Sequence, residues 1–170
     1  FYLTEGELSN NRIDTKEVFK ETTRTYIDIH DNLIFLKDGK SFLWTSERDG
    51  FNHIYKFGYD GSVKQLTKGE WDVVEFMGYD ESKKKIYFSS SMRGATQQHL
   101  HSVDFSGKIL TLDDTPGHHS ANFSANFSYR IHNHSDANTP PIYTLRDRKG
   151  NVVRTLKSND DLKNTLSEYD

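Results

Sequence analysis

The chain has 170 residues, a length that fits one domain by the usual range of roughly 100–200 residues per domain. Its 22 Lys and Arg residues and 25 Asp and Glu residues leave a formal net charge of −3, which gives no basic surface for a nucleic acid or an anionic membrane. Mean hydropathy is low, at −0.81, but 11 Phe, 9 Tyr and 2 Trp residues indicate a folded chain, because disordered chains are poor in aromatic residues. With only 3 Pro and 11 Gly residues, collagen-like and Pro-rich linker classes are excluded.

The chain contains no cysteine, which excludes a disulfide framework, a thiolate nucleophile and a thiolate zinc site. No apolar run approaches the ~18 residues of a membrane-spanning helix, and no charged-then-apolar leader stands at the N-terminus. The sequence begins with Phe1 rather than Met, so we expect a processed or excised piece of a longer protein.

The first 25 residues predict the end of a β-unit, because residues 12–19 are typical of the outer hairpin of an earlier, incomplete unit. A complete unit is expected at residues 26–68. It ends in a hairpin that runs from His53 through Asp60-Gly61, where glycine supplies the positive φ that tight turns require. The other strands of this unit are expected at 27–29, 33–36 and 41–46.

This hairpin recurs twice along the chain. Residues 53–61 align without a gap on residues 99–107, which lie 46 residues further on, and a third copy at 142–150 follows with one inserted residue. Two more units of about four strands are therefore expected, at 69–116 and 117–157. Their remaining strands are predicted at 71–77, 85–90, 108–112, 121–123, 126–132 and 151–156.

Residues 158–170 depart from the strand pattern. Asn159, Asp160 and Asp161 are of the types that cap helices, and Leu162 and Leu166 stand four residues apart. We therefore expect a short helix here.

Four strands every ~43–46 residues are the signature of a β-propeller blade. A β-sandwich also has many short strands, but it has no reason to repeat a sequence at blade length. The predicted fold is all-β: a partial β-propeller of about three four-stranded antiparallel blades, with a short C-terminal helix. Closed propellers need about 4–8 blades, so the chain is part of a larger propeller or is completed by association. Its exposed strand edges predict self-association.

No catalytic or cofactor-binding residue can be assigned. The chain has no Gly-x-Ser-x-Gly motif, and its Ser, His and Asp residues form no arrangement that differs from chance.

The histidines gather in one region. His118, His119, His132 and His134 follow His99 and His101. Imidazoles on adjacent strands can bind a metal, but no Asp or Glu stands at a spacing that is typical of a metal site. We therefore expect solvated histidines, no metal and no cofactor.

The charged turn Ser46–Gly50, partly repeated at Arg93-Gly94, has two interpretations. It is either a rim loop that contacts a ligand or a turn with a local ion pair of little energetic weight. The second interpretation is favoured.

Trp44 and Trp71 are expected to pack between adjacent blades rather than to stack on a ligand. Asn122, Asn126 and Asn133 each begin an N-glycosylation acceptor sequence, which has meaning only in a secreted eukaryotic protein.

The residues from Phe42 to Tyr55 resemble a signature segment of the N-terminal propeller of the dipeptidyl peptidase IV family. The similarity continues through residues 65–73 and resumes at 120–124 and 139–145. The tail, with Asn159, Leu162, Leu166 and Tyr169, resembles the linker that leads into the catalytic domain of that family.

The resemblance implies a function. Members of this family pair an eight-bladed propeller with an α/β-hydrolase domain that holds the Ser, Asp and His, and they release N-terminal X-Pro or X-Ala dipeptides from the cavity between the two domains. The chain would then be a non-catalytic wall of the peptide chamber that docks on its own hydrolase domain, with 158–170 leading toward that domain. The acidic pair that binds the substrate amine lies on an earlier blade. Only Tyr26–Asp31 aligns near the substrate cavity, and no contact is carried over to it.

Mammalian members carry cysteines in these blades, so their absence favours a bacterial member, with export to the periplasm or cell envelope implied by the resemblance.

Two alternatives stay open. One is a stand-alone propeller-like scaffold that binds a protein or a glycan, and the other is a periplasmic propeller of the translocation-accessory type, which would have more regular repeats.

Overall fold

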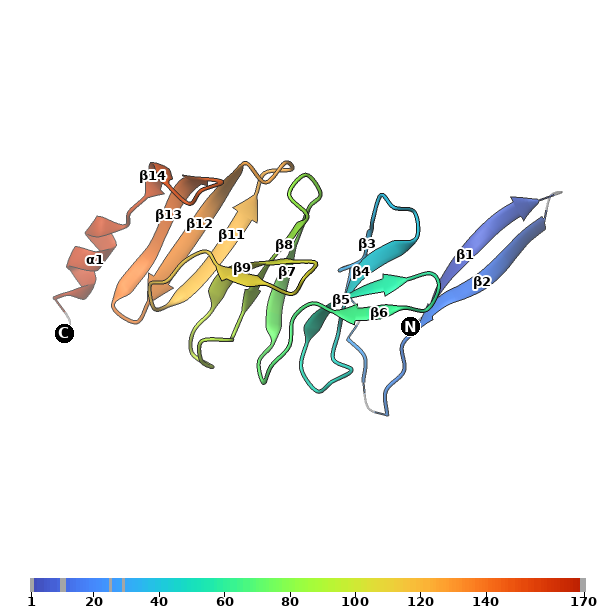
Figure 1. Ribbon diagram of the computed structural model, residues 1–170. Helices are drawn as coiled ribbons and strands as arrows, with labels where there is room; N and C mark the ends of the chain where they lie inside the picture. Colours follow the sequence, from blue (N-terminus) through green and yellow to red (C-terminus); the bar gives the residue numbers. More distant parts are fainter. Residues whose placement is uncertain (1, 10–11, 25, 29, 169–170) are drawn as a thin grey trace.

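The computed structural model describes residues 2–9, 12–24, 26–28 and 30–168. Within these residues the chain forms fourteen strands and one short helix, and the strands make a two-stranded hairpin and three four-stranded sheets (Figure 1). All pairings between neighbouring strands are antiparallel. The predicted all-β fold with three four-stranded antiparallel sheets and a C-terminal helix is confirmed.

The elements follow one another in chain order across the molecule (Figure 1). The hairpin consists of β1 (Tyr2–Ser9) and β2 (Arg12–Lys20), and it projects from one end. The first sheet contains β3 (Ile34–Phe35), β4 (Ser41–Ser46), β5 (His53–Gly58) and β6 (Val63–Gln65). The second contains β7 (Val73–Asp80), β8 (Lys85–Ser90), β9 (His99–Asp104) and β10 (Ile109–Thr111). The third contains β11 (His118–Phe123), β12 (Tyr129–Asp136), β13 (Thr139–Asp147) and β14 (Val152–Lys157), and α1 (Asp160–Leu166) lies at the far end.

The outer hairpin turns have the backbone that the repeat predicts. Gly61 and Gly107 both have positive φ, 85° and 89°, which residues with a Cβ rarely adopt. Each turn closes with a backbone hydrogen bond of 3.0 Å, from Gly61 to the Gly58 carbonyl and from Gly107 to the Asp104 carbonyl.

Two local expectations are wrong. Residues 26–28 form no strand, and Ile29 lies outside the described residues; β3 itself covers only Ile34 and Phe35. The segment before β3 bonds through side chains instead, because His30 and Asn32 both reach the hydroxyl of Thr45 at 3.0 Å.

The second error concerns the cap of α1. Asn159 precedes the helix in a left-handed conformation and makes no side-chain capping bond. Its Nδ2 instead donates to the carbonyl of Pro141 over 2.6 Å, so this side chain ties the helix to β13.

Apolar side chains fill the junction between the first and second sheets. Leu43 and Ile54 from the first sheet meet Ile86, Phe88 and Val103 from the second, and all five are fully buried. The opposite face of the first sheet packs against Phe19 of the hairpin. Every residue of β4 is therefore buried, because both faces of this strand are covered.

Both tryptophans pack between elements, as expected. Trp44 is 2% exposed and meets the ring of Phe19 from β2, with ring centroids 6.2 Å apart. Trp71 stands between His53 of the first sheet and Phe88 of the second, at 4.8 and 6.3 Å between ring centroids.

Candidate functional site

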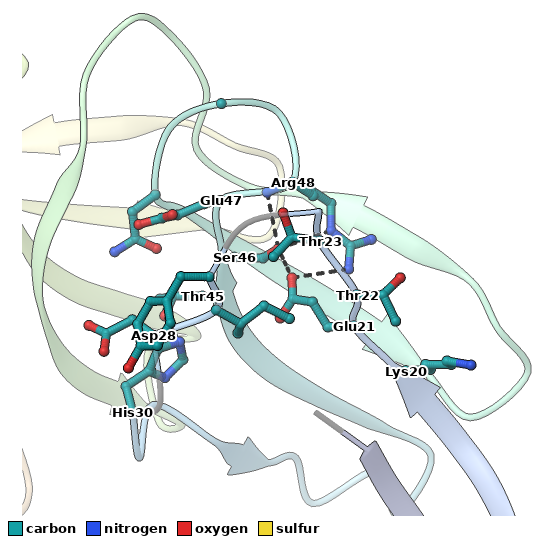
Figure 2. A pocket seen from close by; sticks show the side chains of 14 residues that line it. Lys20, Glu21, Thr22, Thr23, Asp28, His30, Thr45, Ser46, Glu47 and Arg48 are labelled. Atoms are coloured by element: carbon teal, nitrogen blue, oxygen red, sulfur yellow. Dashed lines mark hydrogen bonds and ion pairs between the residues drawn. The ribbon is translucent and has the colours of Figure 1, made fainter.

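A cavity of about 510 Å³ opens at one end of the first sheet (Figure 2). One wall is the segment between β2 and β3, which includes Thr22, Asp28 and His30. The other wall is the end of β4 and the turn after it, with Ser46 and Glu47. The two walls meet because β3 pairs with β4 antiparallel, Ile34 beside Leu43, so the segment before β3 runs beside the end of β4.

Glu21 links the two walls. Its Oε2 accepts the indole N–H of Trp44 over 2.9 Å, and its Oε1 accepts the hydroxyl of Ser46. The guanidinium of Arg48 lies 3.7 Å from Oε1 (Figure 2). The carboxylate is nearly buried, with the side chain 11% exposed, so these donors take the place of its water shell.

Arg48 is fixed by aromatic rings as well as by Glu21. Its guanidinium carbon lies 4.8 Å from the ring centroid of Phe57, 5.1 Å from that of Tyr55 and 5.9 Å from that of Phe19. Its Nε also donates to the hydroxyl of Ser46 over 3.1 Å. Such stacking suits the planar guanidinium and holds the turn after β4 against the sheet.

His30 is held in one tautomer. The backbone N–H of Asn32 donates to Nδ1 over 3.3 Å, so the ring proton of the neutral imidazole is on Nε2, which faces the Thr45 hydroxyl at 3.0 Å. The ring also lies 4.2 Å from the ring of Trp44. Because Nε2 is a donor here, it cannot take a proton from the Thr45 hydroxyl.

Charged and polar side chains line the cavity. The exposed carboxylates of Asp28 and Glu47 lie on its walls, beside the hydroxyl of Thr22. The Ser46 hydroxyl donates to the Glu21 carboxylate, which also accepts the Trp44 indole N–H and lies beside Arg48. The site therefore offers charge and hydrogen bonds to a ligand.

The expectation of solvated histidines is wrong for much of the group. His99, His101, His119 and His132 are each at most 2% exposed, whereas His118 is exposed. The buried rings face the junctions between sheets, where neighbouring elements cover both faces.

Three of the histidines hold the connection from β10 to β11. His99 Nδ1 donates to the carbonyl of Asp113 over 2.9 Å, His119 Nε2 to that of Thr115 over 2.8 Å, and His134 Nε2 to that of Pro116 over 2.9 Å. His132 joins them through His119, since its Nε2 is 2.9 Å from His119 Nδ1. We call His99, His119, His132 and His134 the histidine cluster.

Asp113 is the acidic neighbour that the sequence pattern did not reveal. Its carboxylate, with the donor nitrogens of His119 and His132, forms a buried group whose atoms lie within 4.8 Å of one another. Arg146 Nη1 lies 2.7 Å from its Oδ1, and Arg130 Nη2 lies 3.7 Å from its Oδ2.

These residues have the donor types of a metal site, but their arrangement does not suit one. His119 donates from Nε2 to the Thr115 carbonyl, so its Nδ1 lone pair accepts the proton of His132. Asp113 is already compensated by two guanidinium groups. A cation would have to break the imidazole pair and sit beside two positive charges.

The charged turn Ser46–Gly50 fits both of its interpretations. Gly50 donates to the carbonyl of Glu47 over 2.9 Å, which closes a turn, and Arg48 makes the ion pair described above. The same turn lines the cavity. In the second sheet Arg93 pairs with Asp114 at 2.8 Å.

The three acceptor asparagines lie in the third sheet and its first turn. Asn122 and Asn126 are exposed, and Asn133 is half-buried. Oδ1 of Asn126 accepts the backbone N–H of Ser128 over 3.1 Å, which gives this side chain a role in the turn between β11 and β12.

Comparison with known proteins identifies the family. A family model for the dipeptidyl peptidase IV (DPP IV) N-terminal region matches residues 3–141, which is most of the chain. The chain belongs to the dipeptidyl peptidase IV N-terminal region family.

Relatives of this chain come from fungi and bacteria. Dipeptidyl peptidase 4 of Trichophyton rubrum is 35% identical over 151 residues, which cover 82% of this chain and 19% of the relative. That of Trichophyton equinum is 33% identical over 171 residues, covering 93% of this chain and 22% of the relative. The crystal structure of Porphyromonas gingivalis dipeptidyl peptidase 4 matches 90% of this chain and 22% of its own, with a TM-score of 0.80 and 30% identity. The chain thus spans about a fifth of the length of these relatives.

The absence of cysteine favoured a bacterial origin. This stays a prediction, because dipeptidyl peptidases 4 from a fungus and from a bacterium are both similar to this chain. In the part of the chain that the structure describes, no helix is long and apolar enough to cross a bilayer.

Two residues that organise this dipeptidyl peptidase IV-family structure were not singled out from the sequence. Glu21 gave no signal, because its partners stand 23 and 25 residues later in the chain. For Asp113 a signal existed. The repeat that aligns His53 on His99 also aligns Thr67 on Asp113, and both are buried residues that bond to the aligned histidine.

Proposed function

We propose that this chain is the non-catalytic propeller part of a dipeptidyl peptidase IV-like serine exopeptidase that removes N-terminal X-Pro or X-Ala dipeptides. The family match over residues 3–141 carries this proposal. The catalytic Ser, Asp and His belong to a hydrolase domain of the same protein, outside this chain. Export to the periplasm or cell envelope is part of the same proposal.

Within that enzyme the chain forms one wall of the peptide chamber and a docking surface for the hydrolase domain. The cavity beside Glu21 supports this role, since it lies where the connection into the first sheet meets the turn after β4. Asp28 and Glu47 place negative charge on its walls, toward peptides that enter.

The activity is tested with chromogenic X-Pro and X-Ala dipeptide substrates, on the complete protein and on residues 1–170 alone. We expect turnover by the complete protein and none by the isolated chain. A complete protein that folds but cleaves neither substrate would contradict the proposed function, and so would turnover by the isolated chain.

The role as a chamber wall is tested by narrowing the cavity. Thr22→Trp adds a large ring at the exposed wall, and Glu5→Trp adds the same ring on exposed β1, away from the cavity. We expect Thr22→Trp to lower kcat/KM at least about fivefold for peptides of ten residues, with little effect on the short chromogenic substrates. Equal kcat/KM values of Thr22→Trp and Glu5→Trp for the ten-residue peptides would refute a chamber wall at this position.

A further inference from the structure

The junction between the second and third sheets has a different chemistry from the apolar junction before it. From the second sheet, Ser89 and Ser102 face it, and from the third sheet Arg130 and His132; all four are at most 3% exposed. Its ring contacts are those of Tyr87 with Phe123 and Phe127 and the stacking of His99 on His119, among the described residues. Polar groups therefore hold these two sheets together.

The connection Asp113–Gly117 carries much of this junction, because it runs from the last strand of one sheet to the first strand of the next. The histidine cluster binds three of its carbonyls, and Gln97 Oε1 accepts the N–H of Gly117 over 2.5 Å. The three histidines join the connection to β9, β11 and β12, and Gln97 joins it to the segment before β9.

We propose that this junction is an acid-sensitive hinge, in which protonation of the buried imidazoles of His119 and His132 loosens the third sheet from the second. The inference concerns the protein's conformation and does not depend on the proposed peptidase activity.

The hydrogen-bond geometry gives the first reason. His119 donates from Nε2 to the Thr115 carbonyl and must accept at Nδ1 from His132. A second proton on His119 turns Nδ1 into a donor, so that two N–H groups face each other over 2.9 Å. The bond between the two imidazoles is then lost.

The surrounding charge gives the second reason. The groups that face this pair are Asp113 from the connection, Arg130 and His134 from β12, Arg146 from β13 and His99 from β9. One carboxylate meets two guanidinium groups, so the site already holds an excess of positive charge. Each proton added to an imidazole increases that excess in a buried place.

The protonation equilibria agree with this geometry. Burial lowers the pKa of His132 from 6.5 to about 3, and it also lowers the pKa of His119. The closed junction therefore binds fewer protons than the open one. Its stabilisation is complete above pH 6.5 and is lost as the pH falls below that value. Between pH 7.5 and 5.0 the protonation of His132 alone raises the open fraction by about thirtyfold, and that of His119 acts in the same direction.

The test is hydrogen–deuterium exchange of the complete protein at pH 7.5 and 5.0, with rates corrected for intrinsic exchange. We expect protection of β11 and β12 to fall at least about tenfold more than protection of β4 and β5. Because His101 faces the first junction beside Phe88 and would itself loosen β4 and β5 in acid, the comparison is made in a His101→Phe background. In that background, equal loss in both regions, or no loss at pH 5.0, would overturn the proposal.

A matched pair of variants assigns the effect. His132→Gln keeps an N–H donor for His119 but does not titrate, whereas His118→Gln removes an exposed histidine one residue from His119. We expect His132→Gln to reduce the acid response of β11 and β12 by about tenfold or more, and His118→Gln to leave it unchanged. His119→Gln serves as the second junction variant. A full acid response in both His132→Gln and His119→Gln, or its loss in His118→Gln, would refute the assignment.

Discussion

The indole N–H of Trp44 donates to the Glu21 carboxylate over 2.9 Å, between residues that are 23 positions apart in the chain. This bond joins the segment that enters the first sheet to the second strand of that sheet. Since Glu21 also receives Ser46 and Arg48, the two walls of the cavity are held by one carboxylate. The shape of the cavity therefore depends on this residue.

Replacement of Glu21 separates its hydrogen bonds from its charge. Glu21→Gln keeps an oxygen that accepts the Trp44 indole N–H, and it should lower the free energy of unfolding by about 1 kcal/mol. Glu21→Ala leaves that buried N–H without a partner and should lower it by about 2–3 kcal/mol. Urea unfolding of both variants measures the difference. Equal losses would show that charge, not hydrogen bonding, is what this position supplies.

Neighbouring aspartates in the β10–β11 connection should respond very differently to the same change. The Asp113 side chain is 1% exposed between Arg130 and Arg146, and that of Asp114 is 82% exposed. Asp113→Asn leaves two guanidinium groups uncompensated in a buried site and should cost about 3–5 kcal/mol. Asp114→Asn should leave the unfolding midpoint unchanged in the same denaturant titration. If the two variants unfold alike, the buried ion pairs do not hold the junction.

His101 gives a pH dependence of its own. Burial lowers its pKa from 6.5 to about 4, and its buried Nε2 has no hydrogen-bond partner. The folded state thus resists protonation, so its stabilisation is complete above pH 6.5 and is lost as the pH falls toward 4.

His101→Phe keeps the ring beside Phe88 and cannot titrate. As the pH falls from 6.5 to 4, the free energy of unfolding of His101→Phe should rise relative to that of the wild type by up to about 1.4 kcal/mol per pH unit. Thermal unfolding across that range measures this slope, and the exposed His118→Phe is the control. A pH-independent difference between wild type and His101→Phe would refute this account.

The isolated chain should self-associate through its last strand. β14 is exposed along its whole length, and Val152, Val153 and Leu156 are 45–55% exposed on the edge of the third sheet. We expect light scattering of residues 1–170 to report a mass that increases with concentration. Val153→Lys should reduce this association, whereas Val153→Thr, which keeps the shape without a charge, should not. A monodisperse wild-type monomer at high concentration would contradict the prediction.

Strand positions were predictable because they depend on local pattern. The repeat placed His53 and His99 at equivalent positions, and each is the first residue of its strand. Burial was less predictable, because the second sheet covers one face of the third and polar side chains can take the place of apolar ones on such a covered face. Arg130 and His132 occupy such a face.

The candidate site was harder to predict than the fold. The turn Ser46–Gly50 was noticed from its charges, but its partner Glu21 lies in another element and belongs to no motif. A strand is predicted at 27–29, but residues 26–28 form none, and His30 of this segment instead bonds across to Thr45 of β4. Contacts of this kind depend on tertiary arrangement, which the period of a single strand does not encode.

The two sheet junctions also differ in how they tolerate substitution over evolutionary time. Leu43, Ile54 and Ile86 can exchange among aliphatic residues as long as the total volume is kept. In the polar junction, the loss of one partner leaves a buried charge or N–H group with neither a protein partner nor water, which is destabilising. Among relatives, residues of the first junction should therefore be substituted independently of one another, whereas residues of the second junction should be substituted together in groups.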